Sequence, residues 1–366
     1  MRNGPTRFTK SEEGKIVDWW RTQYGDRDWD WTVDTQAKPP TREEVEEAIK
    51  ALSNRKATGP DGVPSELIKY GGQTVVELHW RIITDVWKRR WLPRAMKGAL
   101  VVLLPKKLGS KAPDDYRPIT LLNTSYKILD KIVANRLALE VEAKSIMHPT
   151  QAGFMKGMST ADQIYRLETV IEHCRTHKKG IICGFLDICK AFDTVRHSDL
   201  NEVMLSRGVN TDTISIIGAM YNNCESNIIM NDRLSDPIRI KKGVRQGGSS
   251  SPICFNLIPN ELAWAISSAD VGVELKSGEM KLGLLLYADD IVLMAHTMSQ
   301  LQQLMNICNT WANKYYLKAN LQKSFVVDYS GKPARVTVTI EGKQLKQLPQ
   351  FKYLGKVIGT SRSDSA

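Results

Sequence analysis

The sequence predicts an α+β fold in which helices flank an antiparallel sheet. Segments of helical periodicity and short apolar runs alternate without a regular order, unlike the strict alternation of a doubly wound parallel sheet. Residues 227–244 and 284–295 each resemble a hairpin, and hairpins join antiparallel strands. The chain has 366 residues, 42% of them hydrophobic, which is enough for one large or two ordinary domains with a real core.

Capping and turn residues predict the helices near the N-terminus. The stretch up to about residue 40 is polar and rich in tryptophan, and it predicts a short amphipathic helix anchored on a neighbouring domain. Thr41 stands before a glutamate-rich turn, which is typical of the N-cap of a helix. The Gly-Pro-Asp-Gly turn at 59–62 separates that helix from another that begins near Pro64.

The later elements follow from hydrophobic periodicity. Helices are expected at about 126–139, 160–176, 198–223, 252–267 and 300–317. Strands are expected at 98–107, 180–188, 227–244, 284–295, 335–345 and 351–358, the third and fourth of these as hairpins. Neither an internal repeat nor a low-complexity segment interrupts the series.

The charge balance favours a polyanionic partner. Fifty-one lysines and arginines against 40 aspartates and glutamates give a formal net charge of +11, and the excess is spread along the chain. Such a distribution suits a long basic surface that contacts nucleic acid. From charge alone, an ordinary basic enzyme is an equally good interpretation.

The cysteines and the hydropathy bound the cellular context. The six cysteines include no CxxC and no paired Cys/His spacing, so neither a zinc site nor a disulfide framework is expected. We find no signal peptide, and no apolar run approaches the roughly 18 residues that a membrane span needs. We therefore expect an intracellular protein of the cytoplasm or nucleus, without a membrane partner.

Two adjacent aspartates interrupt the most apolar stretch, LLLYADDIVLMA at 284–295. At the tip of a hairpin, Asp289 and Asp290 can both emerge at the edge of a rigid sheet. A divalent cation would offset the cost of burying two carboxylates, and all-oxygen ligands favour Mg²⁺ or Mn²⁺. The alternative is a turn whose aspartates simply point into water.

A third acid, Asp187, ends the apolar run IICGFLD about 100 residues earlier. Acids at matching ends of adjacent strands can hold two Mg²⁺ ions roughly 3.5–4 Å apart, the arrangement that assists in-line phosphoryl displacement. Asp193 lies beyond the strand, and we interpret it as a helix cap or an ion-pair residue.

The chain resembles the reverse transcriptases of non-LTR retrotransposons over about residues 50–358. The likeness is carried by an ordered series of motifs: KATGPDGVPSELIK, DYRPITLLNTSYKILDKIVANRL, QAGFMKGMSTADQI, FLDICKAFDTV, GVRQGGSSSP, YADD, LKANLQKS and FKYLG. Each motif alone is weak, but eight in order with family-like spacing are specific.

The resemblance implies a right-hand polymerase with fingers and a palm. It assigns 1–40 to an N-terminal extension, 41–180 to the fingers, 181–358 to the palm with interleaved helices, and 359–366 to a truncated tail. The implied activity is RNA-directed DNA synthesis on a DNA or RNA primer, with an RNA template and dNTPs. The thumb is expected to be largely absent, which weakens the hold on primer and template. We recognise no endonuclease and no Cys/His knuckle.

The resemblance also assigns the site. Asp187, Asp289 and Asp290 become the catalytic triad that binds two Mg²⁺ ions, with Mn²⁺ as a possible substitute, and the backbone carbonyl of Ile188 becomes an extra metal ligand. Phe192 lies where the family places an aromatic ring that excludes a ribose 2′-hydroxyl. The remaining assignments are Arg117, Lys106 (or Lys107), Gln246, Gly247 and Lys323 at the nucleotide, and Tyr353 and Gly355 at the primer.

Two other interpretations stay open. The chain could be a nucleic-acid-binding relic that keeps the polymerase fold without turnover, or an RNA-synthesising polymerase of the same architecture, which Phe192 disfavours. The chain also departs from the family at Ser249 and Ser250, where much of the family has proline and a larger apolar residue. This departure puts template contacts and fidelity in doubt, and the oligomeric state is left open.

Overall fold

The computed structural model describes residues 38–106, 109, 112–276, 281–330 and 337–360, with 10–12, 14, 15 and 18 near the N-terminus. Most of the predicted N-terminal helix, Lys107, the start of the strand expected at 335–345 and most of the tail lie outside these residues. The chain divides into two compact units. The first unit comprises Met1–Lys144 and Phe192–Cys254, and the second comprises Ser145–Ala191 and Phe255–Ala366.

The first unit is mainly helical. Its helices are α2 (Arg42–Lys50), α3 (Ser65–Lys69), α4 (Gly72–Arg89), α5 (Arg94–Lys97), α6 (Thr124–Ala143), α9 (His197–Ser206) and α10 (Thr211–Tyr221). As predicted, Thr41 caps α2. The Thr41 hydroxyl accepts a hydrogen bond from the backbone amide of Glu44, and the Glu44 carboxylate accepts one from the backbone amide of Thr41. The single helix expected at 198–223 is in fact α9 and α10, which are separated at Gly208, where φ is +70°.

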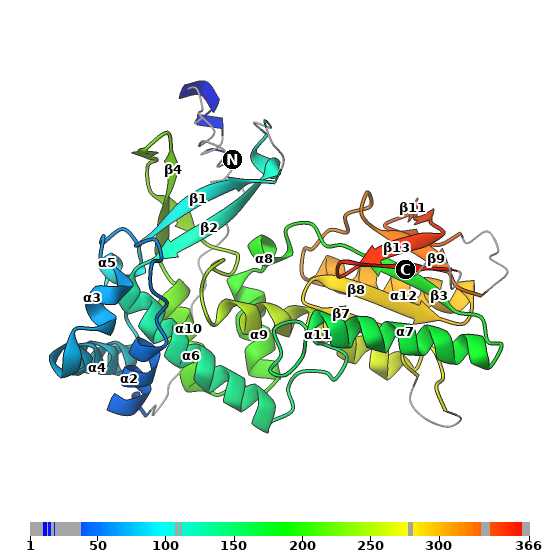
Figure 1. Ribbon diagram of the computed structural model, residues 1–366, viewed down its shortest axis with the longest axis horizontal. Helices are drawn as coiled ribbons and strands as arrows, with labels where there is room; N and C mark the ends of the chain where they lie inside the picture. The colour runs from blue at the N-terminus through cyan, green and yellow to red at the C-terminus, as the bar shows by residue number, and fades with distance from the viewer. Residues whose placement is uncertain are drawn as a thin grey trace. The chain divides into compact units, whose positions relative to one another are not determined.

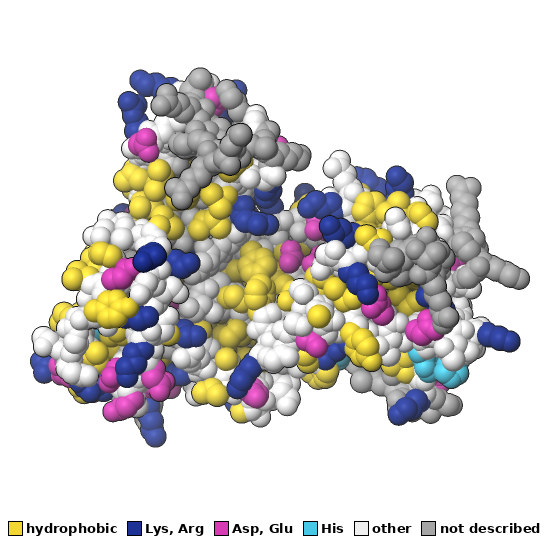
Figure 2. Space-filling view, in the orientation of Figure 1, with side chains coloured by type: hydrophobic (Ala, Val, Ile, Leu, Met, Phe, Trp, Pro, Cys, Tyr) yellow, Lys and Arg dark blue, Asp and Glu magenta, His cyan; other side chains and the backbone are white. Residues whose placement is uncertain are grey.

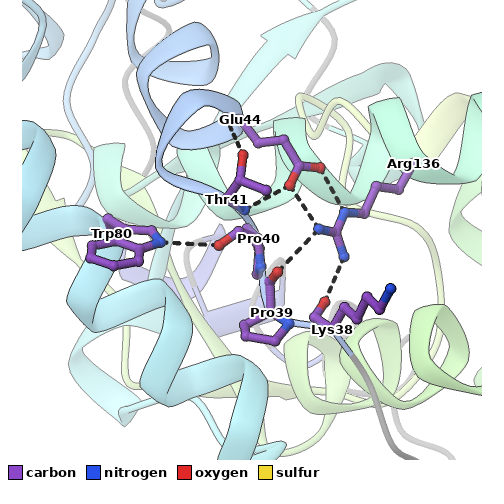
Figure 3. Close-up of polar contacts among 7 residues, drawn as sticks. All are labelled: Lys38, Pro39, Pro40, Thr41, Glu44, Trp80 and Arg136. Atoms are coloured by element: carbon purple, nitrogen blue, oxygen red, sulfur yellow. Dashed lines mark hydrogen bonds and ion pairs between the residues drawn. The ribbon is translucent and has the colours of Figure 1, made fainter.

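Arg136 of α6 binds both α2 and the segment just before it (Figure 3). Arg136 of α6 donates two hydrogen bonds of 2.7 Å to the carboxylate of Glu44, and it also reaches the carbonyl of Lys38. The Arg136 guanidinium lies 4.7 Å from the ring centroid of Trp87 in α4. These hydrogen bonds hold the pKa of Glu44 below its ordinary value.

The sheet of the first unit is mixed. Its strands are β1 (Ala99–Pro105), β2 (Tyr116–Leu122), β4 (Cys224–Met230), β5 (Arg233–Leu234) and β6 (Ile238–Ile240). Strand β1 pairs antiparallel with β2 but parallel with β4, so the expectation of an antiparallel sheet is wrong here. Parallel pairing is possible because a long stretch of chain, which includes β2, β3 and several helices, connects β1 to β4.

The second unit contains the larger apolar core. Its helices are α7 (Thr160–Thr176), α12 (Met298–Lys314) and most of α11 (Ser251–Ala269). Its main sheet has the order β12-β9-β3-β8-β7, formed by Lys346–Gln347, Phe325–Asp328, Ile182–Leu186, Asp290–Ala295 and Leu284–Tyr287 respectively. Two further hairpins are β10 (Thr339–Ile340) with β11 (Lys343–Gln344), and β13 (Gln350–Tyr353) with β14 (Lys356–Gly359).

Alternation along β3 separates the two faces of this sheet. Cys183 and Phe185 belong to an apolar cluster with residues of α7 and of the β13–β14 hairpin. A Cβ on Gly184, on the opposite face, would meet Met305 of α12. Helix α12 therefore covers one face (Figure 1), and the other face carries α7 and the hairpin.

The predicted α+β class is confirmed, and the main sheet is antiparallel apart from its edge strand β12. None of the helices that the structure describes is both long and apolar enough to cross a membrane. Figure 2 shows lysine and arginine side chains dispersed over the visible surface of both units, in keeping with the even spread of basic residues along the chain.

Candidate active site

The acid-bearing turn is a two-residue hairpin. Tyr287 of β7 pairs with Asp290 of β8, which leaves Ala288 and Asp289 as the turn. Ala288 has a positive φ of 55°, a conformation that residues with a side chain rarely adopt. A positive φ at the first turn residue but not the second is typical of a type II′ turn, which suits the twist of a hairpin.

Asp187 follows the last residue of the neighbouring strand. In the antiparallel ladder of β3 and β8, Leu186 pairs with Ile291, so the next step in register brings Asp187 opposite Asp290. Both aspartates line one pocket of about 210 Å³, together with Lys323 and with aromatic side chains of β9 and β13. Two acids separated by about 100 residues thus share one edge of a sheet.

The electrostatics of this edge suit a cation. Burial, and after it the charges of Asp289 and Asp187, raise the pKa of Asp290 to about 6, against a lowering by Lys323. Within the part of the chain that the structure describes, no group of three or more acidic, cysteine or histidine side chains is arranged to hold a metal ion. The raised pKa of Asp290 shows that these carboxylates repel one another.

The loop at 320–324, from which the sequence analysis named only Lys323, also positions Asp187. The amide nitrogen of Asn320 donates to Asp187 Oδ2 at 2.9 Å, and its backbone N–H donates to the Asp187 carbonyl at 2.8 Å. The Asp187 amide donates to the hydroxyl of Ser324 at 3.2 Å. The Lys323 side chain is 69% exposed, and its Nζ lies 3.9 Å from Asp187 Oδ2.

Asn320 is a candidate site residue that the sequence analysis did not name. It stands in the motif LKANLQKS, three residues before Lys323, and that motif was the available signal. Two backbone hydrogen bonds flank Ile188: the Cys189 amide donates to the Lys318 carbonyl, and the Asn320 amide donates to the Asp187 carbonyl. Neither hydrogen bond uses the Ile188 carbonyl.

The β13–β14 hairpin lies beside the acids. Phe351 stacks on Phe185 of β3 with ring centroids 4.3 Å apart, and Tyr353 lies 5.9 Å from the same ring. Tyr353 is buried and lines the pocket of Asp187 and Asp290. Gly355 has a φ of +97° in the turn of the hairpin.

Two predicted nucleotide contacts lie in the first unit, on the segment after β6. The Gln246 side-chain amide donates to Asp193 Oδ1 at 2.8 Å, and its carbonyl accepts from Thr120 of β2 at 3.0 Å. Gly247 has a φ of +124°, and a Cβ there would lie 2.9 Å from the Thr120 carbonyl oxygen. Only glycine suits this position. Asp193 is therefore a hydrogen-bond partner of Gln246, and its role as a helix cap or an ion-pair residue stays a prediction.

The other first-unit assignments are accessible to a ligand. Phe192, in the short helix α8 (Ala191–Thr194), is only partly buried, and its carbonyl accepts from Val244 at 2.9 Å. Arg117 and Lys106 are exposed on and just after the β1–β2 pair. The fold brings these two basic residues to the same end of one hairpin.

The serines that replace the family's proline have a structural partner. The buried carboxylate of Asp130 in α6 accepts from the amides of Ser249 and Ser250 and from the Ser250 hydroxyl. Burial raises the pKa of Asp130, while these hydrogen bonds oppose that rise. A proline at either serine position would remove one of the amide donors.

The comparison with known families decides the assignment. The family model described as "Reverse transcriptase (RNA-dependent DNA polymerase)" matches residues 104–358, which is most of the chain. The chain belongs to the reverse transcriptase family. The predicted resemblance to the enzymes of non-LTR retrotransposons is thereby confirmed.

Its relatives are proteins of mobile elements. The chain is 27% identical to the "Transposon TX1 uncharacterized 149 kDa protein" of Xenopus laevis, over 78% of this chain and 22% of that protein. It is 27% identical to the "Retrovirus-related Pol polyprotein from type-2 retrotransposable element R2DM" of Drosophila melanogaster, over 83% and 29%. For the type-1 retrotransposable element R2 polyprotein of Popillia japonica the identity is 30%, over 70% and 35%. The chain thus spans about a fifth to a third of these relatives.

Proposed function

We propose that this reverse transcriptase chain is an RNA-directed DNA polymerase of a non-LTR retroelement. It extends the 3′-hydroxyl of a DNA or RNA primer along an RNA template. In each step the 3′-hydroxyl loses its proton to water and its oxygen bonds to the α-phosphorus of a dNTP. The bond from that phosphorus to the oxygen that bridges to the β-phosphorus breaks, and pyrophosphate leaves with that oxygen. The observation that carries the proposal is the shared pocket of Asp187 and Asp290 beside Asp289 in a chain of this family.

The donors at this edge fit hard divalent cations. They are carboxylate oxygens, which Mg²⁺ and Mn²⁺ prefer, and the raised pKa of Asp290 reflects a repulsion that bound cations would relieve. Asp187, Asp289 and Asp290 would hold two Mg²⁺ ions, with the Ile188 carbonyl as a further ligand. Such ions neutralise charge on the transferred phosphoryl group.

The chain's own residues bind and orient the substrates. Asn320 keeps Asp187 Oδ2 in place. Lys323, whose Nζ lies 3.9 Å from Asp187 Oδ2, donates a proton to the departing pyrophosphate. Arg117 and Lys106 contact the triphosphate, and Gln246 and Gly247 form part of the nucleotide and template pocket. The Phe192 ring excludes a 2′-hydroxyl, and Tyr353 and Gly355 contact the primer end. In this proposal the main sheet of the second unit is the palm and the β1–β2 hairpin belongs to the fingers.

Primer extension tests the proposal. The purified chain is incubated with poly(rA)/oligo(dT), dTTP and Mg²⁺, beside Asp289→Asn and the matched control Asp270→Asn. Asp270 is a surface aspartate of the same unit whose partner is Lys281, at 3.0 Å. We expect incorporation by the parent and by Asp270→Asn, and a loss of at least 100-fold in Asp289→Asn. Silence from the folded parent would favour the non-catalytic relic.

A further inference from the structure

The turn that carries Asp289 is held in a conformation that its own sequence does not favour. Ala288 adopts a φ of 55° without the freedom of glycine. Such strain persists only where the surroundings impose it. The question is which contacts impose it here.

Gln151 supplies the nearest of these contacts. Its side-chain carbonyl accepts from the Ala288 amide at 3.0 Å and from the Gly153 amide at 2.8 Å, and the side chain is 2% exposed. Because both bonds need an acceptor, the oxygen of this amide must face the turn. Gln151 therefore grips the backbone of the residue next to Asp289.

The surrounding loop extends the grip along β7. The Ala152 amide donates to the Leu286 carbonyl at 2.9 Å, and the Leu286 amide donates to the Thr150 carbonyl at 3.0 Å. Gln163 of α7, also fully buried, donates to the carbonyls of Leu286 and Thr150. Helix α7 packs against β7 (Figure 1), so a helix as well as the loop at 150–153 holds this strand in place.

Close packing leaves no slack in this arrangement. A Cβ at Gly153 would lie only 2.2 Å from the Ala288 amide nitrogen, so the loop passes directly over the turn. Asn256 of α11 donates to the Gly153 carbonyl and fixes the far side of the loop. The loop of Gln151 and Gly153 thus contacts the turn directly, while Gln163 binds β7 and Asn256 binds the loop.

We propose that Gln151 is a positioning residue for catalysis, which holds the strained Ala288–Asp289 turn so that the Asp289 carboxylate is presented beside Asp187 and Asp290. The motif QAGFMKGMSTADQI thereby acquires a role, since it supplies both Gln151 and Gln163. This inference rests on the proposed polymerase function for its kinetic effect. Its structural part, the restraint of the turn, stands apart from activity.

The test replaces Gln151 with methionine, which has a similar length and no acceptor oxygen for the two amides. The matched control is Gln302→Met, because the side-chain carbonyl of Gln302 in the same unit also accepts from a backbone amide, that of Thr339, and its side-chain NH2 group donates to the Thr339 carbonyl. Hydrogen–deuterium exchange of the peptide 284–295, thermal unfolding, and steady-state kinetics of dTTP incorporation are measured for each protein.

We expect faster exchange at the turn in Gln151→Met only. We also expect its kcat to fall about 10- to 100-fold, with a smaller change in the KM for dTTP and a higher Mg²⁺ concentration at half-maximal rate. Adding Ala288→Gly to Gln151→Met is expected to restore much of the lost kcat, because glycine adopts the positive φ without the hydrogen bond to Gln151. A merely structural role for Gln151 predicts no such rescue.

The outcomes separate the two proposals. If the parent incorporates nothing, the polymerase proposal fails, and the exchange data still decide whether Gln151 restrains the turn. If the parent is active and Gln151→Met keeps both its exchange pattern and its kcat, the positioning role is overturned. It is also overturned if kcat falls only in proportion to lost folded protein and Ala288→Gly restores nothing.

Discussion

The environment of Asp290 destabilises the folded chain when this carboxylate is ionised. Its pKa is raised from 3.8 to about 6, so its ionised form is less stable in the folded chain than in the unfolded chain. The cost is fully present above about pH 6 and disappears as the pH falls towards 3.8. A cation bound by the acids would remove the same cost at neutral pH.

This cost gives a prediction that does not depend on turnover. Without metal, Asp290→Asn is expected to raise the free energy of unfolding at pH 8 by on the order of 1–3 kcal/mol, and to change it little at pH 4. Mg²⁺ should raise the melting temperature of the parent and not of the variant. Calorimetry at both pH values checks this, and equal effects of the substitution at pH 4 and pH 8 would contradict it.

Asn320 should matter through Asp187. We expect Asn320→Ala to lower kcat about tenfold or more and to raise the Mg²⁺ requirement, because Asp187 Oδ2 loses the donor that orients it. Ser324→Ala removes the hydroxyl that accepts from the Asp187 backbone and serves as the comparison for a purely backbone contact. Equal losses in both variants would mean that loop folding, and not carboxylate orientation, is at stake.

Phe192 should control the choice of sugar. Replacing it with valine is expected to increase the incorporation of rUTP relative to dTTP by at least tenfold, since a smaller side chain leaves room for a 2′-hydroxyl. The ratio of the two kcat/KM values on the same primer and template measures this. An unchanged ratio would remove Phe192 from the nucleotide site.

The acids could be located from sequence because each follows a short apolar run that could only be a buried strand. Asn320 and Gln151 could not be located in this way. Their hydrogen bonds reach partners more than 130 residues away, and an amide side chain in a loop leaves no periodic signal. The partnership of Asp193 with Gln246, 53 residues along the chain, escaped for the same reason.

At the scale of single elements, sequence failed mostly at short strands. β2 was missed because its apolar residues run on towards α6, with Asn123 as the N-cap between them. β9 was missed because it is four residues long and directly follows a polar loop. The long helices α6 and α7 were expected, since their periodicity extends over several turns.

The anchoring of α2 by Arg136 has a measurable energy. We expect Arg136→Ala to lower the free energy of unfolding of the first unit by about 1–2 kcal/mol at pH 7, through the loss of a two-pronged ion pair and its packing on Trp87. The lowered pKa of Glu44 means that this contribution is present above pH 4.5 and is lost at lower pH. Denaturant titrations of parent and variant at pH 7 and pH 3 check both statements, and a gap as large at pH 3 as at pH 7 would contradict the second.

At the scale of the whole molecule, the net charge of +11 should govern affinity for nucleic acid. We expect the logarithm of the association constant for an RNA–DNA primer–template to fall linearly with the logarithm of salt concentration, by roughly 0.7–0.9 per phosphate neutralised. Fluorescence anisotropy across a salt series measures the slope. Binding that does not depend on salt would remove the basic surface from the interaction.

The order of the strands in the main sheet has a consequence for the nascent chain. β3 is flanked by β8 and β9, so its first partner leaves the ribosome about 100 residues after it. At roughly 5–20 residues per second, an apolar strand waits several seconds with both edges unpaired. During translation this strand is therefore exposed to aggregation, and a chaperone that shields Ile182–Leu186 would raise the yield of folded protein.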